Sequence, residues 1–200
     1  MSRLEDVLRR ISKDLEEKGA RFALVGGLAV SARTEPRFTR DVDLAVAAPG
    51  DPAAEAIVAG LRARGYRPVA TVEQESAGRM AQVRLAPPGE PAEGAIVDLL
   101  FASSGIEREI VDSAEPLEVV KGLRIPVAVL GHLLALKVLS RDDRSRPQDA
   151  GDLAALLSVA RPADRSLAAS ALALIEERGF GRGRSLVADY HRLAGDPDGE

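Results

Sequence analysis

Three aspartates in two apolar segments are the residues whose types and spacing could do chemistry. Asp41 and Asp43 lie two positions apart in DVDLAV, and Asp98 interrupts the apolar run IVDLLF. Residues i and i+2 of a β-strand point to the same face, so the first two carboxylates would lie side by side. They would repel each other and resist desolvation unless a hard divalent cation lay between them. The pattern predicts a Mg²⁺ or Mn²⁺ site with Asp41, Asp43 and Asp98 as ligands.

The Gly26–Gly27 pair adds a second element to this predicted site. It follows an apolar run and precedes a short apolar stretch that can open a helix. Successive backbone N–H groups in a tight turn before a helix form a nest for anions. A phosphate cradle beside metal-binding acids suits two-metal nucleotidyl transfer, with Asp98 nearest the attacking hydroxyl.

Each acid also has an ordinary structural interpretation. Asp41 and Asp43 could be solvated residues of an edge strand, because exposed carboxylates are common. Asp98 could end its strand and accept hydrogen bonds from backbone amides. Aspartate is disfavoured in strands, so two of them opening a strand favour the functional interpretation.

Composition excludes several classes of protein. The chain has 200 residues, 46% of them hydrophobic, so it can form a sizeable core. It has no cysteine, which rules out disulfides and Cys-ligated zinc, and its two histidines are too few for a His-based metal centre. The net charge of −4 argues against nucleic-acid binding by the whole surface. No apolar run is long enough for a membrane span, and the charged amphipathic N-terminus does not resemble a signal peptide, so we expect a cytoplasmic protein without a membrane partner.

Hydrophobic periodicity and turn residues predict a mixed first part and a helical second part. We expect residues 1–125 to form an α+β core and residues 126–200 a C-terminal helical region. The predicted strands are 22–25, 41–47, 79–86, 95–101, 117–120 and 123–125. The predicted helices are 3–18, 28–32, 51–65, 106–113, 127–140, 149–159, 164–178 and 184–193.

Charged residues in the second part are candidates for the same site. Lys137 and Arg141 are four residues apart on an otherwise apolar helix, so they share a face. Lys137 either snorkels at the helix edge or points into a charged cleft. Arg141 is either a solvated loop residue or a weak phosphate guide. Asp149 and Asp152 lie three apart where the next helix starts, where helix-dipole interactions and exposed salt bridges are the simpler explanation.

With these residues in place, the chain resembles the DNA polymerase β-like nucleotidyltransferase superfamily. Its pattern is a Gly-Gly or Gly-Ser turn, an Asp-x-Asp strand and a third carboxylate on a later strand. The string GGLAVSARTEPRFTRDVDL is more specifically similar to AbiEii-type, MenT-like toxins of type IV toxin–antitoxin systems. A second block, from Leu136-Lys137 through Arg146-Pro147-Gln148-Asp149 to Leu153, resembles a helical motif of that group. The resemblance covers roughly residues 20–157.

The resemblance implies a polymerase-β-like core, with a mixed, mostly antiparallel sheet flanked by helices. It implies transfer of a nucleoside monophosphate (NMP) from an NTP to an acceptor hydroxyl, with Mg²⁺ and release of pyrophosphate. Many superfamily members have serine where this chain has Gly27, and Ser31 could partly substitute for it. The residues that the resemblance assigns to catalysis are Asp41, Asp43, Asp98 and Lys137. Those assigned to nucleotide binding are Gly26, Gly27, Ser31, Arg37, Thr39, Lys137, Arg141 and Asp149.

The acceptor stays open at this point. Transfer RNA, a protein hydroxyl and a small molecule such as an aminoglycoside are the candidates, and a cognate antitoxin is a candidate partner. A non-catalytic nucleotide- or partner-binding module on the same fold is the alternative, because a fold does not fix a function. NTP binding without turnover would distinguish that module from the enzyme.

Overall fold

The computed structural model describes residues 3–74, 78–91, 94–141 and 147–195. Strands and helices are interspersed up to residue 127, and all later elements of the described residues are helical. The strands are β1 Phe22–Val25, β2 Asp41–Val46, β3 Arg67–Gln74, β4 Arg79–Ala86, β5 Ile96–Leu100, β6 Glu115–Val120 and β7 Leu123–Val127. The helices are α1 Arg3–Glu16, α2 Gly26–Arg33, α3 Asp51–Arg62, α4 Glu107–Asp112, α5 Leu130–Ser140, α6 Pro147–Val159, α7 Pro162–Glu177 and α8 Leu186–Ala194.

The strands form one sheet in the order β3-β4-β5-β2-β1-β7-β6. The β1–β7 and β2–β5 pairs are parallel, and the other four pairs are antiparallel. The predicted α+β class with a mixed, mostly antiparallel sheet is therefore confirmed. The parallel β2–β5 pair matters most for the site, because it places Asp43 directly opposite Asp98.

Strand β3 has no counterpart among the predicted strands. It occupies one edge of the sheet, where Pro68 is tolerated because an edge strand leaves part of its backbone unpaired. Val69 and Val72 on this strand are more than half exposed, at 55% and 52%. Its sequence, RPVATVEQ, shows little alternation because both faces are largely solvated.

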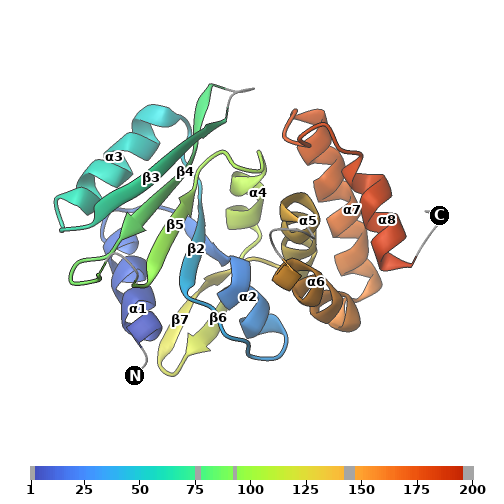
Figure 1. Cartoon of the computed structure of the whole chain (residues 1–200), viewed down its shortest axis with the longest axis horizontal. Coiled ribbons are helices and arrows are strands. Elements are labelled where there is room, and N and C mark those ends of the chain that lie inside the picture. Colours follow the sequence, from blue (N-terminus) through green and yellow to red (C-terminus); the bar gives the residue numbers. More distant parts are fainter. Residues whose placement is uncertain (1–2, 75–77, 92–93, 142–146, 196–200) are drawn as a thin grey trace.

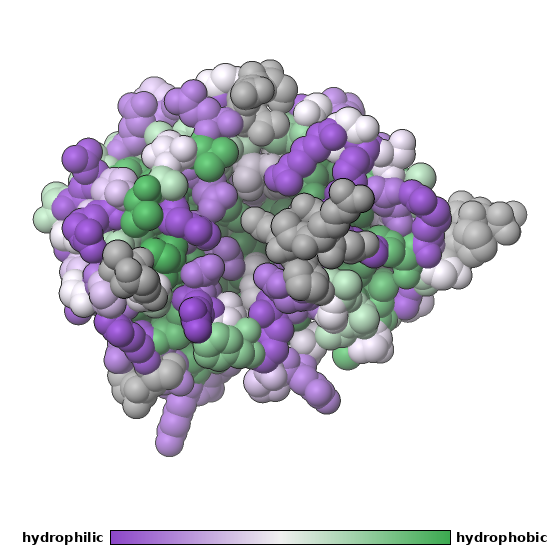
Figure 2. Space-filling model, viewed as in Figure 1, coloured by the Kyte–Doolittle hydropathy of each residue, from purple (hydrophilic) through white to green (hydrophobic). Residues whose placement is uncertain are grey.

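Helices cover the sheet on two sides (Figure 1). Helices α1 and α3 lie on one side, and α2 and α4 lie on the side that faces the C-terminal helices. Helix α1 buries Leu8, Ile11 and Leu15, spaced three and four residues apart as an amphipathic helix requires. Hydrophobic residues on the face shown in Figure 2 appear in small separate areas among hydrophilic ones.

The helical region packs against the sheet-containing part without a break in the core. One cluster of buried hydrophobic residues includes Leu24 and Leu44 from the sheet and Leu133 and Leu172 from the helices. Gly131 allows α5 to approach α7, because a Cβ there would lie 2.7 Å from the Asp164 carbonyl oxygen. None of the described helices is both long and apolar enough to cross a membrane.

Candidate active site

The acids of the sheet gather where β2 and β5 run side by side. Alternation puts Asp41 and Asp43 on one face of β2, while Val42 and Leu44 are fully buried on the other. The parallel register sets Asp43 opposite Asp98, whose side chain is almost wholly buried. The chain thus brings together the three carboxylates that the sequence singled out.

The start of α2 lies against these acids. Strand β1 leads straight into α2, which begins at Gly26, two residues earlier than predicted. Gly26 has a φ of +65°, and a Cβ there would lie 2.0 Å from Oδ2 of Asp43. Only glycine fits this close approach, so the amide end of α2 and the acids of β2 share one space.

The missing side chain of Gly27 leaves room for other groups. A Cβ at this position would lie 2.7 Å from Nη2 of Arg37 and 3.0 Å from Oγ1 of Thr39. The Arg37 guanidinium and the Thr39 hydroxyl therefore lie close to the Gly27 backbone. The Oγ of Ser31 accepts a hydrogen bond of 3.2 Å from the Arg37 amide, so this side chain helps to hold the segment after α2.

Arg84 on β4 binds the third acid. Its Nε and Nη2 donate hydrogen bonds of 3.0 and 2.7 Å to the two carboxylate oxygens of Asp98. Its Nη2 also lies 4.0 Å from Oδ2 of Asp41. This pair follows from strand register, which sets Arg84 directly opposite Asp98. Asp98 is consequently neutralised by a bidentate partner, whereas Asp43 has no such partner among the residues that the structure describes.

The pKa values of the β2 acids reflect this shortage of positive charge. Burial raises the pKa of Asp43 to about 7, and the negative charges of Asp98 and Asp41 add to the effect. Burial also raises the pKa of Asp41, against the attraction of Arg84. A cation beside these two acids would relieve both the desolvation and the repulsion.

The donor set fits a divalent ion that arrives with a phosphate ligand. Within the described ranges, no group of three or more His, Cys, Asp or Glu side chains forms a ready-made metal site. Arg84 holds both oxygens of Asp98. Asp41 and Asp43 remain, and Mg²⁺ is usually held by one or two carboxylates together with substrate phosphates. The predicted role of Asp98 as a ligand stays a prediction.

Helices α5 and α6 carry a second cluster of charged residues, in which each acid is paired with a cation. Nζ of Lys137 lies 2.7 Å from Oδ1 of Asp149 and 2.8 Å from Oδ2 of Asp152. Nη2 of Arg37 donates a 2.6 Å hydrogen bond to the same Oδ2 of Asp152, and Oγ of Ser140 donates one of 3.1 Å to Oδ2 of Asp149. Both acids are buried, at 4% and 2% exposure, so these bonds fix the Lys137 ammonium in place.

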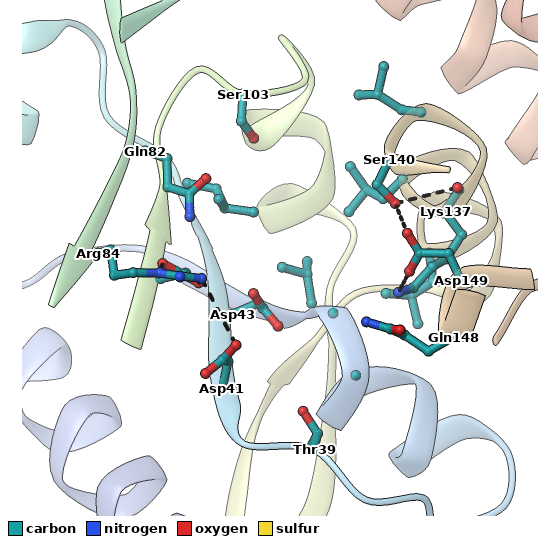
Figure 3. Close-up of a pocket in the computed structure, with 18 of the residues that line it drawn as sticks. Thr39, Asp41, Asp43, Gln82, Arg84, Ser103, Lys137, Ser140, Gln148 and Asp149 are labelled. Atoms are coloured by element: carbon teal, nitrogen blue, oxygen red, sulfur yellow. Dashed lines mark hydrogen bonds and ion pairs between the residues drawn. The ribbon is translucent and has the colours of Figure 1, made fainter. Parts of the chain in front are cut away.

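A cavity of about 450 Å³ separates the two clusters. Figure 3 shows Asp41, Asp43 and Arg84 on one side, and Lys137, Ser140 and Asp149 on the other. Of the residues expected at the site, nine line this cavity: Gly26, Gly27, Arg37, Thr39, Asp41, Asp43, Asp98, Lys137 and Asp149. Ser31 and Arg141 do not line it. Asp149 lines the cavity, whereas Asp152 lies behind it and binds Lys137 and Arg37.

Sequence reasoning missed several polar residues of the cavity. These are Gln82, Arg84, Ser103, Ser140, Gln148 and Arg182. The alternating pattern of β4 could have indicated two of them, because Gln82 and Arg84 lie on the less buried face of the strand. The others come from helix ends and loops, where no periodicity marks them.

The chain is similar in fold to known proteins. A nucleotidyltransferase-like antigenic protein from Paracoccidioides brasiliensis has a similar structure, with a TM-score of 0.54 and 17% identity, covering 96% of this chain and 92% of that one. The antibiotic-resistance factor ANT(2'')-Ia is similar with a TM-score of 0.50 and 17% identity, covering 94% of this chain and 96% of that one. At such identities these similarities establish the fold. A search of curated proteins finds no match.

The sequence itself establishes the family. A family model described as "Nucleotidyl transferase AbiEii toxin, Type IV TA system" matches residues 6–197. The match contains both sides of the cavity, from the glycines of α2 and the acids of β2 to Lys137 on α5. The chain therefore belongs to the AbiEii family of nucleotidyltransferases.

Proposed function

We propose that this protein transfers an NMP from an NTP to an acceptor hydroxyl, with Mg²⁺ as cofactor and pyrophosphate as the leaving group. One observation carries the proposal: Asp41 and Asp43 lie beside the amide end of α2 and face Lys137 across one cavity. A triphosphate needs these three kinds of group, namely metal-binding acids, backbone donors and a fixed cation.

Each group has a place in the reaction. A bound Mg²⁺ would neutralise triphosphate oxygens and orient the α-phosphorus. The amides of Gly26 and Gly27 bind phosphate oxygens, with Thr39 and the Arg37 guanidinium next to them. Lys137, held by Asp149 and Asp152, supports the charge that develops on the leaving pyrophosphate.

The proposed reaction forms one bond to phosphorus and breaks another. The acceptor oxygen forms a bond to the α-phosphorus, and the bond from that phosphorus to the bridging oxygen of pyrophosphate breaks. The acceptor proton passes to a cavity carboxylate, for which Asp98 is proposed, after Arg84 releases one of its oxygens. The exposed side chain of Arg84 has room for such a movement, being 42% accessible.

Our proposals for the acceptor and the partner rest on the family alone. A toxin of a type IV system points to an antitoxin partner and to an acceptor whose modification arrests growth, for which we propose transfer RNA. The structural similarity to ANT(2'')-Ia makes a small hydroxylated molecule the second acceptor to test. A non-catalytic nucleotide-binding module is the second candidate function, and the hold of Arg84 on Asp98 is the observation that favours it.

The experiment incubates the protein with each α-labelled NTP, Mg²⁺ and, separately, total transfer RNA, a protein extract and an aminoglycoside. Asp41→Ala/Asp43→Ala is the inactive variant, and Asp112→Ala, which removes an acid on α4 that pairs with Arg21, is the matched control. We expect label on an acceptor with the wild type and with Asp112→Ala only. Bound NTP without label or pyrophosphate release in any arm would overturn the transferase in favour of the binding module.

A further inference from the structure

The loop between α7 and α8 contains a residue in an unusual backbone conformation. Arg182 has a φ of +54°, and among the described residues it is the one non-glycine with a positive φ. Its neighbours in the sequence Gly-Phe-Gly-Arg-Gly-Arg include Gly179 and Gly183, which have φ values of +80° and +69°. A left-handed conformation is disfavoured for a residue that carries a side chain, and glycine avoids this penalty.

Both ends of this loop are anchored. On its first side, Phe180 is buried against Gly105, where a Cβ would lie 2.5 Å from the ring. On its second side, Arg184 donates hydrogen bonds of 3.1 and 2.8 Å to Oδ2 of Asp189, and one of 3.3 Å to the carbonyl oxygen of Leu139. Two fixed points, one on each side, leave Arg182 little freedom to relax its φ.

The anchored loop delivers Arg182 to the cavity that holds the acids and Lys137. Ser103, from the segment after β5, and Ser140, from the end of α5, line the same cavity. Arg182 lies more than 130 residues from the Asp-x-Asp pair in the sequence, so the helical region closes the cavity from a side that the sheet does not supply. Strain at a cavity residue that is fixed from both sides is typical of a functional position.

We propose that Arg182 is a substrate-binding residue that contacts the triphosphate of the NTP. The proposal rests on the nucleotidyltransferase function given above. Guanidinium groups are suited to phosphate because their planar donors pair with two oxygens at once. A triphosphate is the most highly charged part of the substrate, and Arg182 lines the same cavity as the acids of β2 and Lys137, from the loop between α7 and α8.

The positive φ of Arg182 allows its side chain to be removed without adding backbone strain. Arg182→Gly removes the guanidinium and at the same time relieves the left-handed strain. We expect it to raise the melting temperature by about 2 to 4 °C, and to weaken binding of a non-hydrolysable ATP analogue about tenfold with Mg²⁺ present. Arg182→Lys should retain part of the affinity, since a lysine keeps the charge and loses the planar fork. Arg62→Ala, which removes an exposed cation of α3, is the matched control and should change neither value appreciably.

Calorimetry with the ATP analogue and with inorganic tripolyphosphate identifies the group that Arg182 contacts. A similar loss of affinity for both ligands supports the proposal. A loss for the analogue alone would place Arg182 on the nucleoside, and unchanged affinity for both would assign the residue no binding role; either result overturns the proposal. A wild-type protein that binds neither ligand would instead overturn the proposed function itself. A lower melting temperature for Arg182→Gly, with affinity unchanged, would show that the side chain is structural.

Discussion

The two sides of the cavity use the same residue type in opposite ways. On the sheet side, Asp41 and Asp43 face each other and Asp98 with one arginine among them, and the pKa of Asp43 is raised to about 7. On the helix side, Asp149 and Asp152 are buried but surrounded by Lys137, Arg37 and Ser140. The sheet-side acids lack positive charge, and the helix-side acids are satisfied. The aspartates around this cavity thus divide into a group that is short of positive charge and a group that holds Lys137 and Arg37 in place.

Asp43→Asn should give the largest effect, because it removes an acid from the charge-deficient side. We expect NMP transfer to fall by about a thousandfold or more, since the variant cannot hold a divalent ion against the triphosphate. Unfolding in EDTA at pH 8 should occur at a temperature at least as high as in the wild type, because a repelled buried charge is gone. Retention of transfer activity by this variant would contradict the role assigned to the sheet side.

Gly26→Ala tests how closely α2 approaches the acids. A Cβ would lie 2.0 Å from Asp43, so we expect transfer to fall by about a hundredfold as the carboxylate is displaced. Gly19→Ala is the matched control, since Gly19 has the same φ of +65° and an added Cβ there meets nothing within 4 Å. Both variants incur left-handed strain, so equal losses of activity would show that the approach to Asp43 is unimportant.

Asp152→Asn makes the same chemical change on the helix side, where the acid is paired. Here we expect the substitution to lower the stability of the fold. It leaves Arg37 without its 2.6 Å partner and Lys137 with one carboxylate instead of two. We expect the free energy of unfolding to drop by about 2 kcal/mol, which for a chain of this size lowers the melting temperature by about 4 to 8 °C. Urea denaturation beside Asp43→Asn provides the measurement. If both variants were destabilised equally, the contrast between the two sides would be lost.

The pH dependence of metal binding sharpens the contrast further. The native pKa of Asp43 is raised from 3.8 to about 7, so the folded protein keeps this proton where the unfolded chain has lost it. Stability from this group is therefore full below about pH 4 and falls as the pH rises to about 7. A divalent ion must displace the proton below pH 7, so Mg²⁺ should raise the melting temperature more at pH 8 than at pH 6. An equal increase at both values would count against Asp43 as a ligand.

Arg84→Gln should have the smallest effect, because it removes a positive charge from the sheet side but leaves all three acids in place. Asp98 would lose its bidentate partner and add its charge to those of Asp41 and Asp43. We expect Mg²⁺ alone, titrated by calorimetry, to bind about threefold to tenfold more tightly, while stability in EDTA falls by about 1 kcal/mol. Weaker Mg²⁺ binding would indicate that Arg84 orients Asp98 for the metal.

Local patterns were sufficient to predict the sheet-side acids. Alternation along β2 and the single charge in β5 each predict which face of the strand carries the acids. The parallel pairing of the two strands brings those faces together. The bidentate pair between Arg84 and Asp98 could not be predicted in this way, because it depends on which strand lies beside β5. The early start of α2 at Gly26 was missed because glycine usually ends or interrupts helices, and here the close approach to Asp43 requires it. Strand β3 was missed because an edge strand has no buried face to impose a period.

The β1–β7 pairing has a consequence for the order of folding. Strand β1 pairs with β2, the next strand in the chain, but its other neighbour is the distant parallel strand β7, with Leu24 opposite Val127. Closing a loop of roughly 100 residues is entropically costly, so contacts of this kind form late. Strand β1 ends where Gly26 begins α2, so the N-terminal end of that helix, which lines the cavity, should become rigid only when the strand is flanked on both sides. Catalytic competence should therefore appear in the slow phase of refolding, after most of the helical signal has been regained.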